Sequence, residues 1–331
     1  MIELTVIMPV YNGQEFVAES IDSVLNQTFS NFKLLILNDN SQDQTAKILE
    51  DYRLNDSRIE VVTKTKNVGP ANLRNEGISL TKTEYIALLD ADDIALPTRF
   101  EKQLDFLSRN PEYGVCGTWF TFFGDKENKT IRHEETHDRL KIQMLNNCCI
   151  GNPTVMFKKS HLGNLRFENK YVPAEDYGLW SQLIAKTKFY NIPESLLQYR
   201  WHPNNISQTK EINLKKSEVI IKKKQLQNLG ILFDDKEINA YLNAVSLTRG
   251  LTKTEIIKTV EASKKLIDLN AEKKVYNHAL FIAHIEKVMI RTIRNCTENS
   301  RSYYMFIKKK SGYFSKIPTL DKIVLFFKCL F

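Results

Sequence analysis

The sequence predicts an α/β fold with a mostly parallel sheet flanked by helices, followed by an all-helical region. Short apolar runs predict buried strands, and segments with apolar residues at helical spacing separate these runs. Strands that are apolar throughout and alternate with helices are typical of parallel sheets covered on both faces. After residue 206 proline becomes scarce and lysine frequent, and apolar residues recur at helical spacing, which predicts the helical region.

The alternation of strands and helices can be followed along the chain. Apolar runs predict strands at 4–8, 32–37, 59–63 and 85–89. Helical spacing predicts helices near 15–25, 44–52, 70–79 and 99–107. In the first of these helices, Phe16, Val17, Ile21 and Val24 fall on one face. Further along, strand-like and helical segments follow at 114–123, 180–185 and 189–199.

The basic helical region carries two local signals. Thr252 and Glu255 have the spacing of a capping box, which predicts that a helix begins there. Residues 271–295 have helical spacing throughout and predict one long helix. The change in composition predicts a first domain over 1–207 and a basic helical region over 208–331.

Length and composition exclude several classes of protein. The chain has 331 residues, 42% hydrophobic and 26% charged, so it is neither disordered nor collagen-like and is long enough to bury a core. Its five cysteines include no CxxC pair, which indicates reduced cysteines in a cytoplasmic protein. The N-terminus lacks the pattern of a signal peptide. No apolar run reaches the roughly 18 residues that a membrane-spanning helix needs.

Charge is unevenly distributed along the chain. Residues 1–204 carry a formal net charge of −4, whereas residues 205–331 carry +12. A basic segment favours nucleic acid or an anionic membrane as a partner. Its lysines are mixed with acids and lack an aromatic platform, so we expect no nucleic-acid partner. Lysines beside Phe- and Leu-rich stretches predict peripheral contact with an anionic membrane through 301–331, with packing on the first domain or on a second subunit as the alternative.

Polar residues follow each of the first four predicted strands. In open α/β sheets, ligands bind outside the carboxyl ends of the strands, so this edge is the expected ligand site. The first strand is followed by a single glycine, Gly13, and not by GxGxxG, and GxxxxGK[ST] is also missing. The edge is therefore not predicted to bind NAD, or ATP phosphates in the manner of a P-loop.

The strongest signal is the acidic run that follows the fourth predicted strand. Asp90, Asp92 and Asp93 lie within four residues. Closely packed carboxylates repel one another unless a cation lies among them. Oxygen ligands of this kind suit Mg²⁺ or Mn²⁺ held with the help of substrate phosphates. We therefore predict a divalent cation among these carboxylates.

Together these motifs resemble family 2 glycosyltransferases, which have the GT-A fold. The resemblance covers residues 1 to about 207, and its motifs occur in the order and spacing of the family. It implies a nucleotide-sugar half over about 1–100 and an acceptor half over about 101–207. The matching stretches are VIMPVYNG (6–13), SVLNQTF (23–29), LNDNSQDQT (37–45), NVGPANLRNEG (67–77), LLDADDIALPTRF (88–100), AEDYGLW (174–180) and YRWHPNNIS (199–207).

The resemblance implies which residues bind the donor. In this family the loop after the first strand holds the base and ribose, and Tyr11 is placed to stack on the base. Asp39 corresponds to an aspartate that hydrogen-bonds the base, while Asn38 replaces the aspartate before it. The implied donor-binding residues are Pro9, Tyr11, Asn12, Asp39, Arg74, Asp90, Asp92, Arg200 and His202. Asp90, Ala91 and Asp92 correspond to the DxD motif of the family, and the implied ligands of the cation are Asp92 and Asp93.

The resemblance also implies the catalytic base and the acceptor side. Asp176 corresponds to the base of the ED motif, although Gly178 stands where the family often has a further aspartate. A carboxylate there would take the proton of the attacking hydroxyl, much as the base of an inverting glycosidase activates water. Asn152, Thr154 and Glu175 are the implied acceptor residues. The one-residue departure of Gln198-Tyr199-Arg200-Trp201 from QxxRW favours transfer of a single sugar.

The implied activity is inverting, metal-dependent transfer of a hexosyl or N-acetylhexosaminyl group. UDP is the expected nucleotide, and the acceptor is a saccharide or lipid-linked saccharide in bacterial surface polysaccharide synthesis. The implied location is cytoplasmic, peripheral on the inner face of the plasma membrane. The sequence leaves open whether the protein forms a homo-oligomer. The alternatives are a catalytically degenerate sugar-nucleotide-binding or scaffold protein and, with less support, a nucleotidyltransferase.

Overall fold

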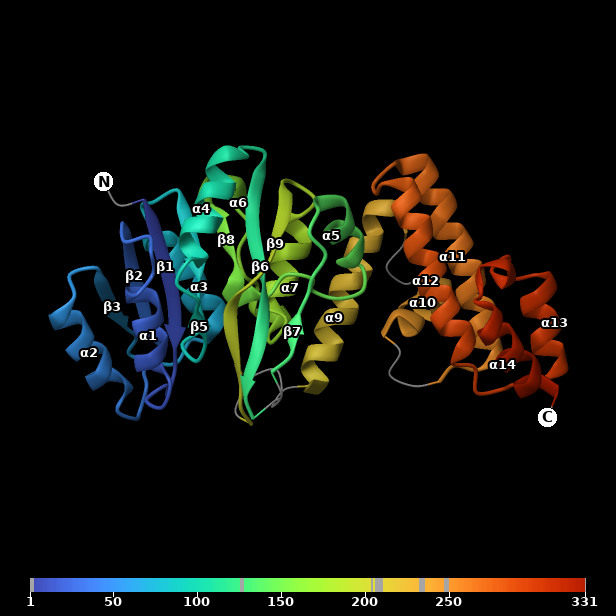
Figure 1. Cartoon of the computed structure of the whole chain (residues 1–331), viewed down its shortest axis with the longest axis horizontal. Coiled ribbons are helices and arrows are strands. Elements are labelled where there is room, and N and C mark those ends of the chain that lie inside the picture. Colours follow the sequence, from blue (N-terminus) through green and yellow to red (C-terminus); the bar gives the residue numbers. More distant parts are fainter. Residues whose placement is uncertain are drawn as a thin grey trace. The chain divides into compact units, whose positions relative to one another are not determined.

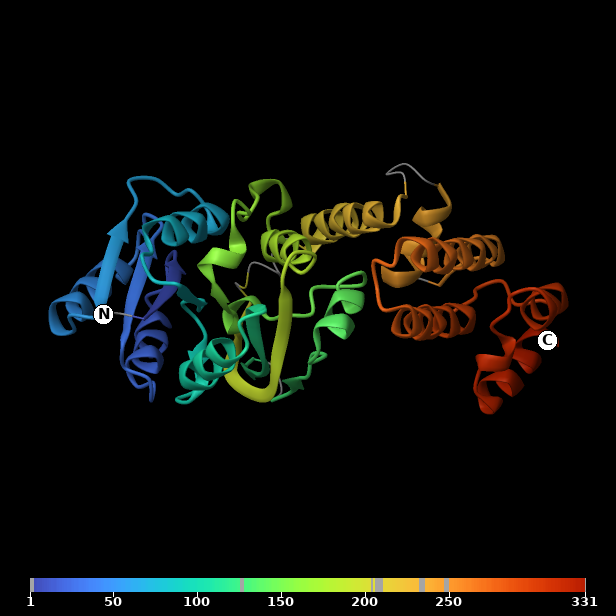
Figure 2. The same ribbon diagram turned by 90° about the horizontal axis from the view of Figure 1, so that it is seen from above.

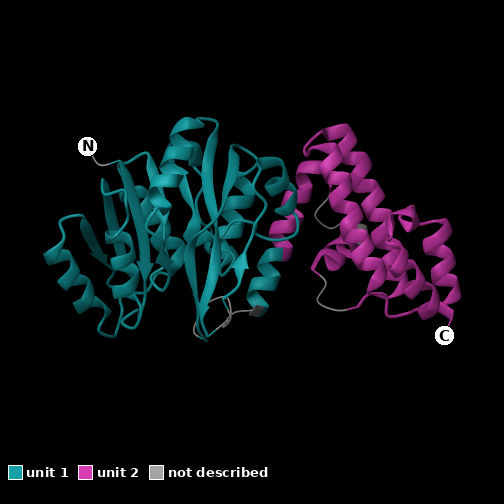
Figure 3. Ribbon diagram, in the orientation of Figure 1, with its two compact units in different colours: residues 1–218 teal, residues 219–331 magenta. Residues whose placement is uncertain are grey.

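The computed structural model describes residues 3–125, 128–203, 205, 211–231, 236–246 and 250–330. The chain divides into two compact units, Met1–Glu218 and Val219–Phe331 (Figure 3). The first unit is an α/β domain and the second is helical (Figure 1). The predicted combination of an α/β domain and a C-terminal helical region is confirmed.

Among the described residues, the first unit contains one nine-stranded sheet with the order β3-β2-β1-β4-β8-β6-β9-β5, and β7 pairs with β6. The strands are β1 Leu4–Val10, β2 Phe32–Asn38, β3 Ile59–Thr63, β4 Tyr85–Leu88, β5 Ile94–Ala95, β6 Tyr113–Gly124, β7 Thr130–Ile131, β8 Met156–Lys158 and β9 Lys188–Trp201. The pairing from β3 to β4 is parallel, as predicted. Beyond β4 the sheet is mixed, because β8 runs antiparallel to both β4 and β6.

The register brings the functional loops to one edge. Val10 pairs with Asn38, and Asn38 pairs with Thr63, so β1, β2 and β3 end side by side. Ile7 pairs with Leu88, which ends β4 beside the same neighbours. The loops that follow these four strands therefore share the carboxyl edge of the sheet.

Helices cover both faces of this sheet (Figure 2), and the central strands β1 and β2 are accordingly buried along nearly their whole length. Leu4, Val6 and Met8 share one buried cluster with α1 and α4. On the opposite face Gly77 of α3 packs so closely on Ile7 that a Cβ would lie 2.8 Å from it. The helices of this unit are α1 Val17–Leu25, α2 Thr45–Asn55, α3 Pro70–Leu80, α4 Arg99–Arg109, α5 His137–Gln143, α6 Lys159–Leu162 and α7 Glu175–Leu183. Helix α9, Glu211–Leu226, begins in the first unit and ends in the second.

The second unit is built from helices around a core that includes Leu266, Phe281, Ile285 and Met289. Its helices are α10 Lys236–Ser246, α11 Lys253–Lys273, α12 His278–Arg294, α13 Arg301–Lys309 and α14 Thr319–Leu330. The predicted capping box is confirmed, since the Thr252 and Glu255 side chains cap the start of α11 reciprocally. In the described part of the chain, no helix has the length and apolar character needed to cross a membrane.

The single long helix predicted over 271–295 is wrong. α11 ends at Lys273, and Lys274 adopts the left-handed conformation with φ +53°. α12 begins at His278, where the Asn277 side chain accepts a hydrogen bond from the backbone of Leu280. Asparagine is a strong N-cap residue, so a local signal inside the apolar pattern divides it into two helices.

Candidate active site

The loops after β1 and β2 are joined by hydrogen bonds. The Asn12 N–H donates to Ser41 Oγ at 3.0 Å, and Asn12 Oδ1 accepts from the Gln42 N–H at 2.8 Å. The Gly13 N–H donates to Thr45 Oγ1 at the start of α2. Pro9 lies in β1 just before this loop, and Tyr11 is 51% exposed. The loop is thus fixed through its backbone, while the Tyr11 ring stays open to a ligand.

Asp39 lies between two of these loops. It is buried, its Oδ1 accepts from the Val68 N–H at 2.8 Å, and its Oδ2 accepts from the Gly69 N–H at 2.9 Å. Gly69 has φ +85°, which favours glycine, and it precedes α3. Asp39 therefore holds the entry of α3 against the loop after β2. Each Asp39 oxygen accepts one backbone hydrogen bond. The contact with the base that the sequence predicts for Asp39 stays a prediction.

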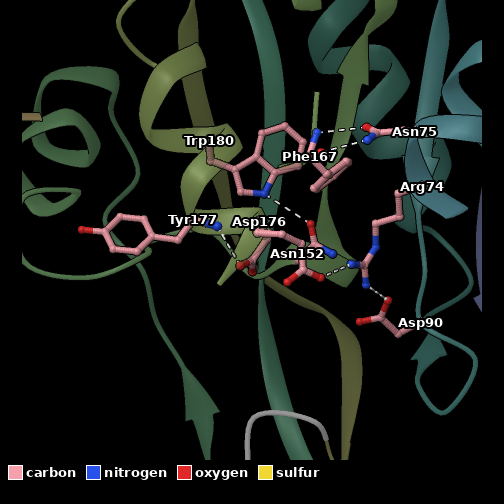
Figure 4. Close-up of polar contacts among 9 residues, drawn as sticks. Arg74, Asn75, Asp90, Asn152, Phe167, Asp176, Tyr177 and Trp180 are labelled. Carbon is pink, nitrogen blue, oxygen red and sulfur yellow. Dashed lines mark hydrogen bonds and ion pairs between the residues drawn. The ribbon is translucent and has the colours of Figure 1, made fainter. Parts of the chain in front are cut away.

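Arg74 of α3 joins two carboxylates from distant parts of the chain (Figure 4). Its Nη1 donates to Glu175 Oε1 at 2.7 Å and its Nη2 donates to Asp90 Oδ1 at 2.8 Å. The neighbouring Asn75 binds the backbone of Phe167 through both its amide atoms, at 2.8 and 2.9 Å. Arg74 is thus a buried counter-ion at the centre of the site, and it also takes up the carboxylate of Glu175, a predicted acceptor residue.

Asp176 begins α7 beside Glu175. Its Oδ1 accepts a hydrogen bond from the Tyr177 N–H at 2.7 Å (Figure 4). Burial, followed by repulsion from Glu175, raises the pKa of Asp176 to about 7. A general base is most effective when its pKa lies near the working pH, so this environment suits proton abstraction. The predicted base therefore lies in the acidic cluster formed by residues 90–93 and 175–176.

Asp92 faces the end of β9. Its Oδ2 lies 3.0 Å from His202 Nε2 and 3.4 Å from Asn205 Nδ2. The Asn205 side chain in turn accepts from the His202 N–H at 2.7 Å, which fixes the turn that carries the imidazole. Asn204, Ile206 and Ser207 of the predicted YRWHPNNIS motif lie outside the described residues.

A carboxylate beside an imidazole is a donor pair that a Mn²⁺ ion accepts. No group of three or more His, Cys, Asp or Glu side chains that could hold a metal occurs in the described part of the chain. Two protein donors leave most coordination positions for other ligands. This suits a cation that takes its remaining ligands from a diphosphate and water.

Asp93, predicted as a second metal ligand, has a different environment. It is buried, and its Oδ1 accepts from the Arg200 N–H at 2.9 Å, which ties the loop after β4 to β9. Burial, together with repulsion from Asp92 and Asp90, raises the pKa of Asp93. Beneath it the buried Arg99 donates to the Leu88 carbonyl at 2.8 Å, and burial lowers the pKa of Arg99 to about 9. Asp93 thus makes a positioning contact with β9, and its role as a second metal ligand stays a prediction.

Arg200 is held on several sides. Its guanidinium lies 4.6 Å from the Phe16 ring centroid and 4.4 Å from that of Phe123. Its Nε donates to the Asp92 carbonyl at 2.8 Å, and its Nη2 pairs with Glu19 of α1. Arg200 therefore lies beside Asp92, and its contact with the donor stays a prediction, since Glu19 already pairs with the charge that a diphosphate would use.

Two predicted acceptor residues lie inside the fold. Thr154 is fully buried and donates to the Gly151 carbonyl at 2.7 Å. Asn152 is 7% exposed, and its Oδ1 accepts from Trp180 Nε1 at 3.3 Å (Figure 4). Both residues stabilise the turn before β8, and the contact with the acceptor stays a prediction. Nothing in the sequence around Pro153 indicates which way the side chains of Asn152 and Thr154 point.

Sequence reasoning missed several residues of the site. Glu19 and Phe16 on α1 hold Arg200, and Asn205 orients His202. Tyr199 of β9 lies near the acidic cluster, and burial together with Asp93 and Asp90 raises its pKa. Glu19 and Phe16 lie on an ordinary amphipathic helix, so no local signal marks them. Tyr199 and Asn205 lie inside the matching YRWHPNNIS stretch, which was the available signal.

Comparison with known proteins agrees with this geometry. Residues 5–165 match the family model for glycosyl transferase family 2. The chain is 34% identical over 205 residues to an uncharacterized glycosyltransferase of Methanocaldococcus jannaschii, covering 60% of this chain and 70% of that protein. It is 31% identical over 218 residues to the Escherichia coli UDP-Glc:alpha-D-GlcNAc-diphosphoundecaprenol beta-1,3-glucosyltransferase WfgD, covering 64% and 83%.

Two solved structures share the fold. Staphylococcus aureus TarS 1-349 in complex with UDP-GlcNAc has a TM-score of 0.57 at 16% identity, covering 88% of this chain and 90% of that chain. The match to a longer TarS chain covers 54% of its length. Mannosyltransferase PcManGT from Pyrobaculum calidifontis in complex with GDP-Man and Mn²⁺ has a TM-score of 0.55 at 14% identity, covering 88% and 86%. The sheet order, the motifs and these matches together show that the chain belongs to the family 2 glycosyltransferases and has the GT-A fold.

Proposed function

We propose that this glycosyltransferase moves a hexosyl or N-acetylhexosaminyl group from a UDP-sugar to a lipid-linked saccharide, with inversion at the anomeric carbon. The single observation that carries the proposal is the position of Asp176. It lies in the same cluster as Arg74 and Asp90, and its pKa of about 7 suits a base. WfgD, named for a UDP-Glc donor and a diphosphoundecaprenol-linked acceptor, supports the choice of substrates.

The donor would lie across the loops after β1, β2 and β3. The exposed Tyr11 ring offers a stacking surface for a base, which is worth about 1–3 kcal/mol in other nucleotide sites. The hydrogen bonds that join Asn12, Ser41 and Gln42 hold this surface before the ligand arrives. A preorganised loop loses less entropy on binding, which favours affinity.

Asp92 and His202 would hold a divalent cation, Mn²⁺ or Mg²⁺. When bound, the cation would act as a Lewis acid that stabilises the charge developing on the diphosphate. The chain's own contribution here is to keep both side chains in place through Asn205. Mn²⁺ in the complex of the similar mannosyltransferase PcManGT supports the choice of metal.

The reaction needs one protein base. The Asp176 carboxylate would take the proton of the acceptor hydroxyl while the oxygen forms a bond to the anomeric carbon. The bond from that carbon to the diphosphate oxygen breaks at the same time, and the nucleoside diphosphate leaves from the opposite face. Arg74 keeps Glu175 and Asp90 paired, so that Asp176 is the carboxylate left to accept the proton.

The experiment that tests this function is a thermal-shift panel of nucleotides and sugar nucleotides with and without Mn²⁺. A ligand at about 100 times its Kd adds about 2.7 kcal/mol to the stability of the state that binds it, and thus about 5–10 °C to Tm. We expect UDP and one UDP-sugar to produce this shift with Mn²⁺, and Asp92→Asn to abolish the metal dependence. No shift with any nucleoside diphosphate would contradict the proposal. Binding without transfer to any lipid-linked acceptor would instead favour the scaffold alternative.

A further inference from the structure

Helix α14 in the second unit has two apolar faces. The inner face carries Leu325 and Cys329, which are each 5% exposed, and the adjacent Phe326 contacts the Tyr304 ring of α13 at 5.4 Å. The outer face carries five large apolar side chains at helical spacing, each between 48% and 77% exposed: Leu320, Ile323, Val324, Phe327 and Leu330. Packing within the unit therefore explains one face of α14 and leaves the other in contact with solvent.

This outer face differs from the other exposed apolar residues that the structure describes. Leu54 and Leu80 are exposed to similar degrees but lie singly on two different helices, and the exposed Ile212 and Ile220 of α9 are eight residues apart. Single exposed apolar residues are common and need no explanation, whereas a contiguous group marks a surface that binds something. Spacings of three and four residues place the five side chains on one stripe along α14.

The segment that carries the stripe is strongly basic. Residues 301–331 contain six lysines and one arginine against a single acidic residue, Asp321. Asp321 is 18% exposed and pairs with Arg294 at 3.3 Å, so it does not offset the lysines. Lys308 and Lys309 end α13, and Lys328 stands exposed on α14. A partner of this surface must therefore accept apolar side chains and carry negative charge.

We propose that the outer face of α14 inserts into the headgroup region of an anionic lipid bilayer, with the lysines of α13 and α14 at the phosphates. A helix of this kind lies in the plane of the interface and buries its apolar face to about 5–10 Å. A second copy of the chain is a poorer partner, because two identical basic surfaces would repel. The inference goes beyond the proposed reaction and does not depend on it, but it would place the enzyme on the surface that carries a lipid-linked acceptor.

The test is co-sedimentation of the full chain with vesicles of phosphatidylcholine alone and of phosphatidylcholine with phosphatidylglycerol. We expect binding to the anionic vesicles only, and loss of binding as salt rises. The variant Ile323→Gln, Val324→Gln, Phe327→Gln should bind at least about tenfold more weakly, because burial of three large apolar side chains is lost. The matched control Leu54→Gln, Leu80→Gln, Ile212→Gln removes a similar amount of exposed apolar surface and should bind like the wild type.

A charge variant keeps the test decisive if the apolar variant folds poorly. Lys308→Gln, Lys309→Gln, Lys328→Gln should weaken binding to anionic vesicles by roughly fivefold for each lysine and flatten the salt dependence. The UDP- and Mn²⁺-dependent thermal shift reports on the first unit and should not change in either variant, so failure of the membrane proposal and failure of the proposed function are distinguishable. Equal sedimentation of wild type and both variants would overturn the inference. The inference would also be overturned if sedimentation velocity showed a dimer for the wild type and the charge variant but a monomer for the apolar variant.

Discussion

Two sides of the same sheet edge are built in opposite ways. On the side of β1 to β3, loops are held by neutral hydrogen bonds such as Asn12 to Ser41, and by Asp39 with both oxygens in use. On the side of β4, β9 and α7, carboxylates crowd together and burial raises the pKa of Asp90, Asp93 and Asp176. The polar groups of the first side are hydrogen-bonded to one another without a ligand. The carboxylates of the second side repel one another, and a bound cation or proton would reduce this repulsion.

The difference separates binding from chemistry. A settled loop can recognise a nucleotide at low entropic cost, and its mutation should change affinity. In the proposed function the crowded acidic cluster provides the base and the cation site, so its mutation should change the rate of transfer. If variants on the β1 to β3 side changed the rate of transfer and variants of the acidic cluster changed the affinity instead, this division would be wrong.

The largest expected effect comes from Asp176→Asn on the acidic side. Loss of a positioned general base should lower kcat for transfer by about 10²- to 10⁴-fold, while the Kd for UDP with Mn²⁺ stays near the wild-type value. Direct assay of sugar transfer together with calorimetric titration of UDP checks both parts. Asp105→Asn, at an exposed helix position, is the matched control and should leave both unchanged.

The same variant makes a prediction about stability. The folded-state pKa of Asp176 is raised to about 7 from an ordinary value of 3.8, so the charged carboxylate is disfavoured in the folded state. As pH rises from about 4 to about 7, the unfolded chain ionises first and the wild type loses stability relative to Asp176→Asn. The advantage of the variant in Tm should therefore grow over this range and stay constant above it. An Asn variant that is less stable at pH 8 than at pH 4, relative to wild type, would show that the carboxylate is not penalised by burial.

Arg74→Met tests the centre of the acidic side. It leaves Glu175 and Asp90 without their buried partner, and removal of one member of a buried ion pair costs about 3–5 kcal/mol. Chemical denaturation should show this loss. Arg53→Met removes the exposed partner of Glu50 and should cause no measurable change. Equal stabilities of the two variants would mean that the Arg74 pairs contribute no more than a surface ion pair.

Asp39→Asn tests the settled side. The amide group of asparagine can accept only one of the two backbone N–H bonds at Val68 and Gly69, so we expect a loss of about 1–3 kcal/mol in unfolding free energy. The Kd for UDP should rise because the entry of α3 shifts, while kcat at saturating donor stays near wild type. A fall in kcat with an unchanged Kd for UDP would contradict the prediction that Asp39 acts on donor affinity and not on transfer.

The smallest effect is expected for Ser41→Ala. It removes one acceptor for the Asn12 N–H at an exposed position, where water can replace the hydroxyl. Unfolding free energy should change by no more than about 1 kcal/mol, and the Kd for UDP by no more than about fivefold. Titration calorimetry of UDP with the Ser41 and Asp39 variants measures how much less the exposed Ser41 contributes to affinity than the buried Asp39.

Local patterns explain what could be predicted from the sequence. The apolar runs of β1 to β4 and the capping box at Thr252 depend on neighbouring residues and are confirmed. The antiparallel insertion of β8 between β4 and β6 depends on contacts between distant segments, and β8 has only three residues. No periodicity in the sequence could reveal that pairing.

The site shows the same division between position and direction. Motif order assigns Arg74, Asp90 and Asp176 to one site, and the structure brings them into one charged cluster, while their roles stay predictions. The sequence could not show that Asp93 turns toward the backbone of Arg200, or that Thr154 lies inside the fold. Those directions follow from packing against β9 and β6, which are remote in sequence.

The most direct test of the central claim, that Asp176 is the base, is the pH dependence of kcat/KM for transfer. Because the base must be deprotonated, kcat/KM should rise tenfold per pH unit below a pKa of about 7 and level off above it. His202→Asn should lower the rate and keep the same profile. A profile that is flat between pH 5 and 8, or one whose inflection disappears in His202→Asn, would contradict the assignment of the base to Asp176.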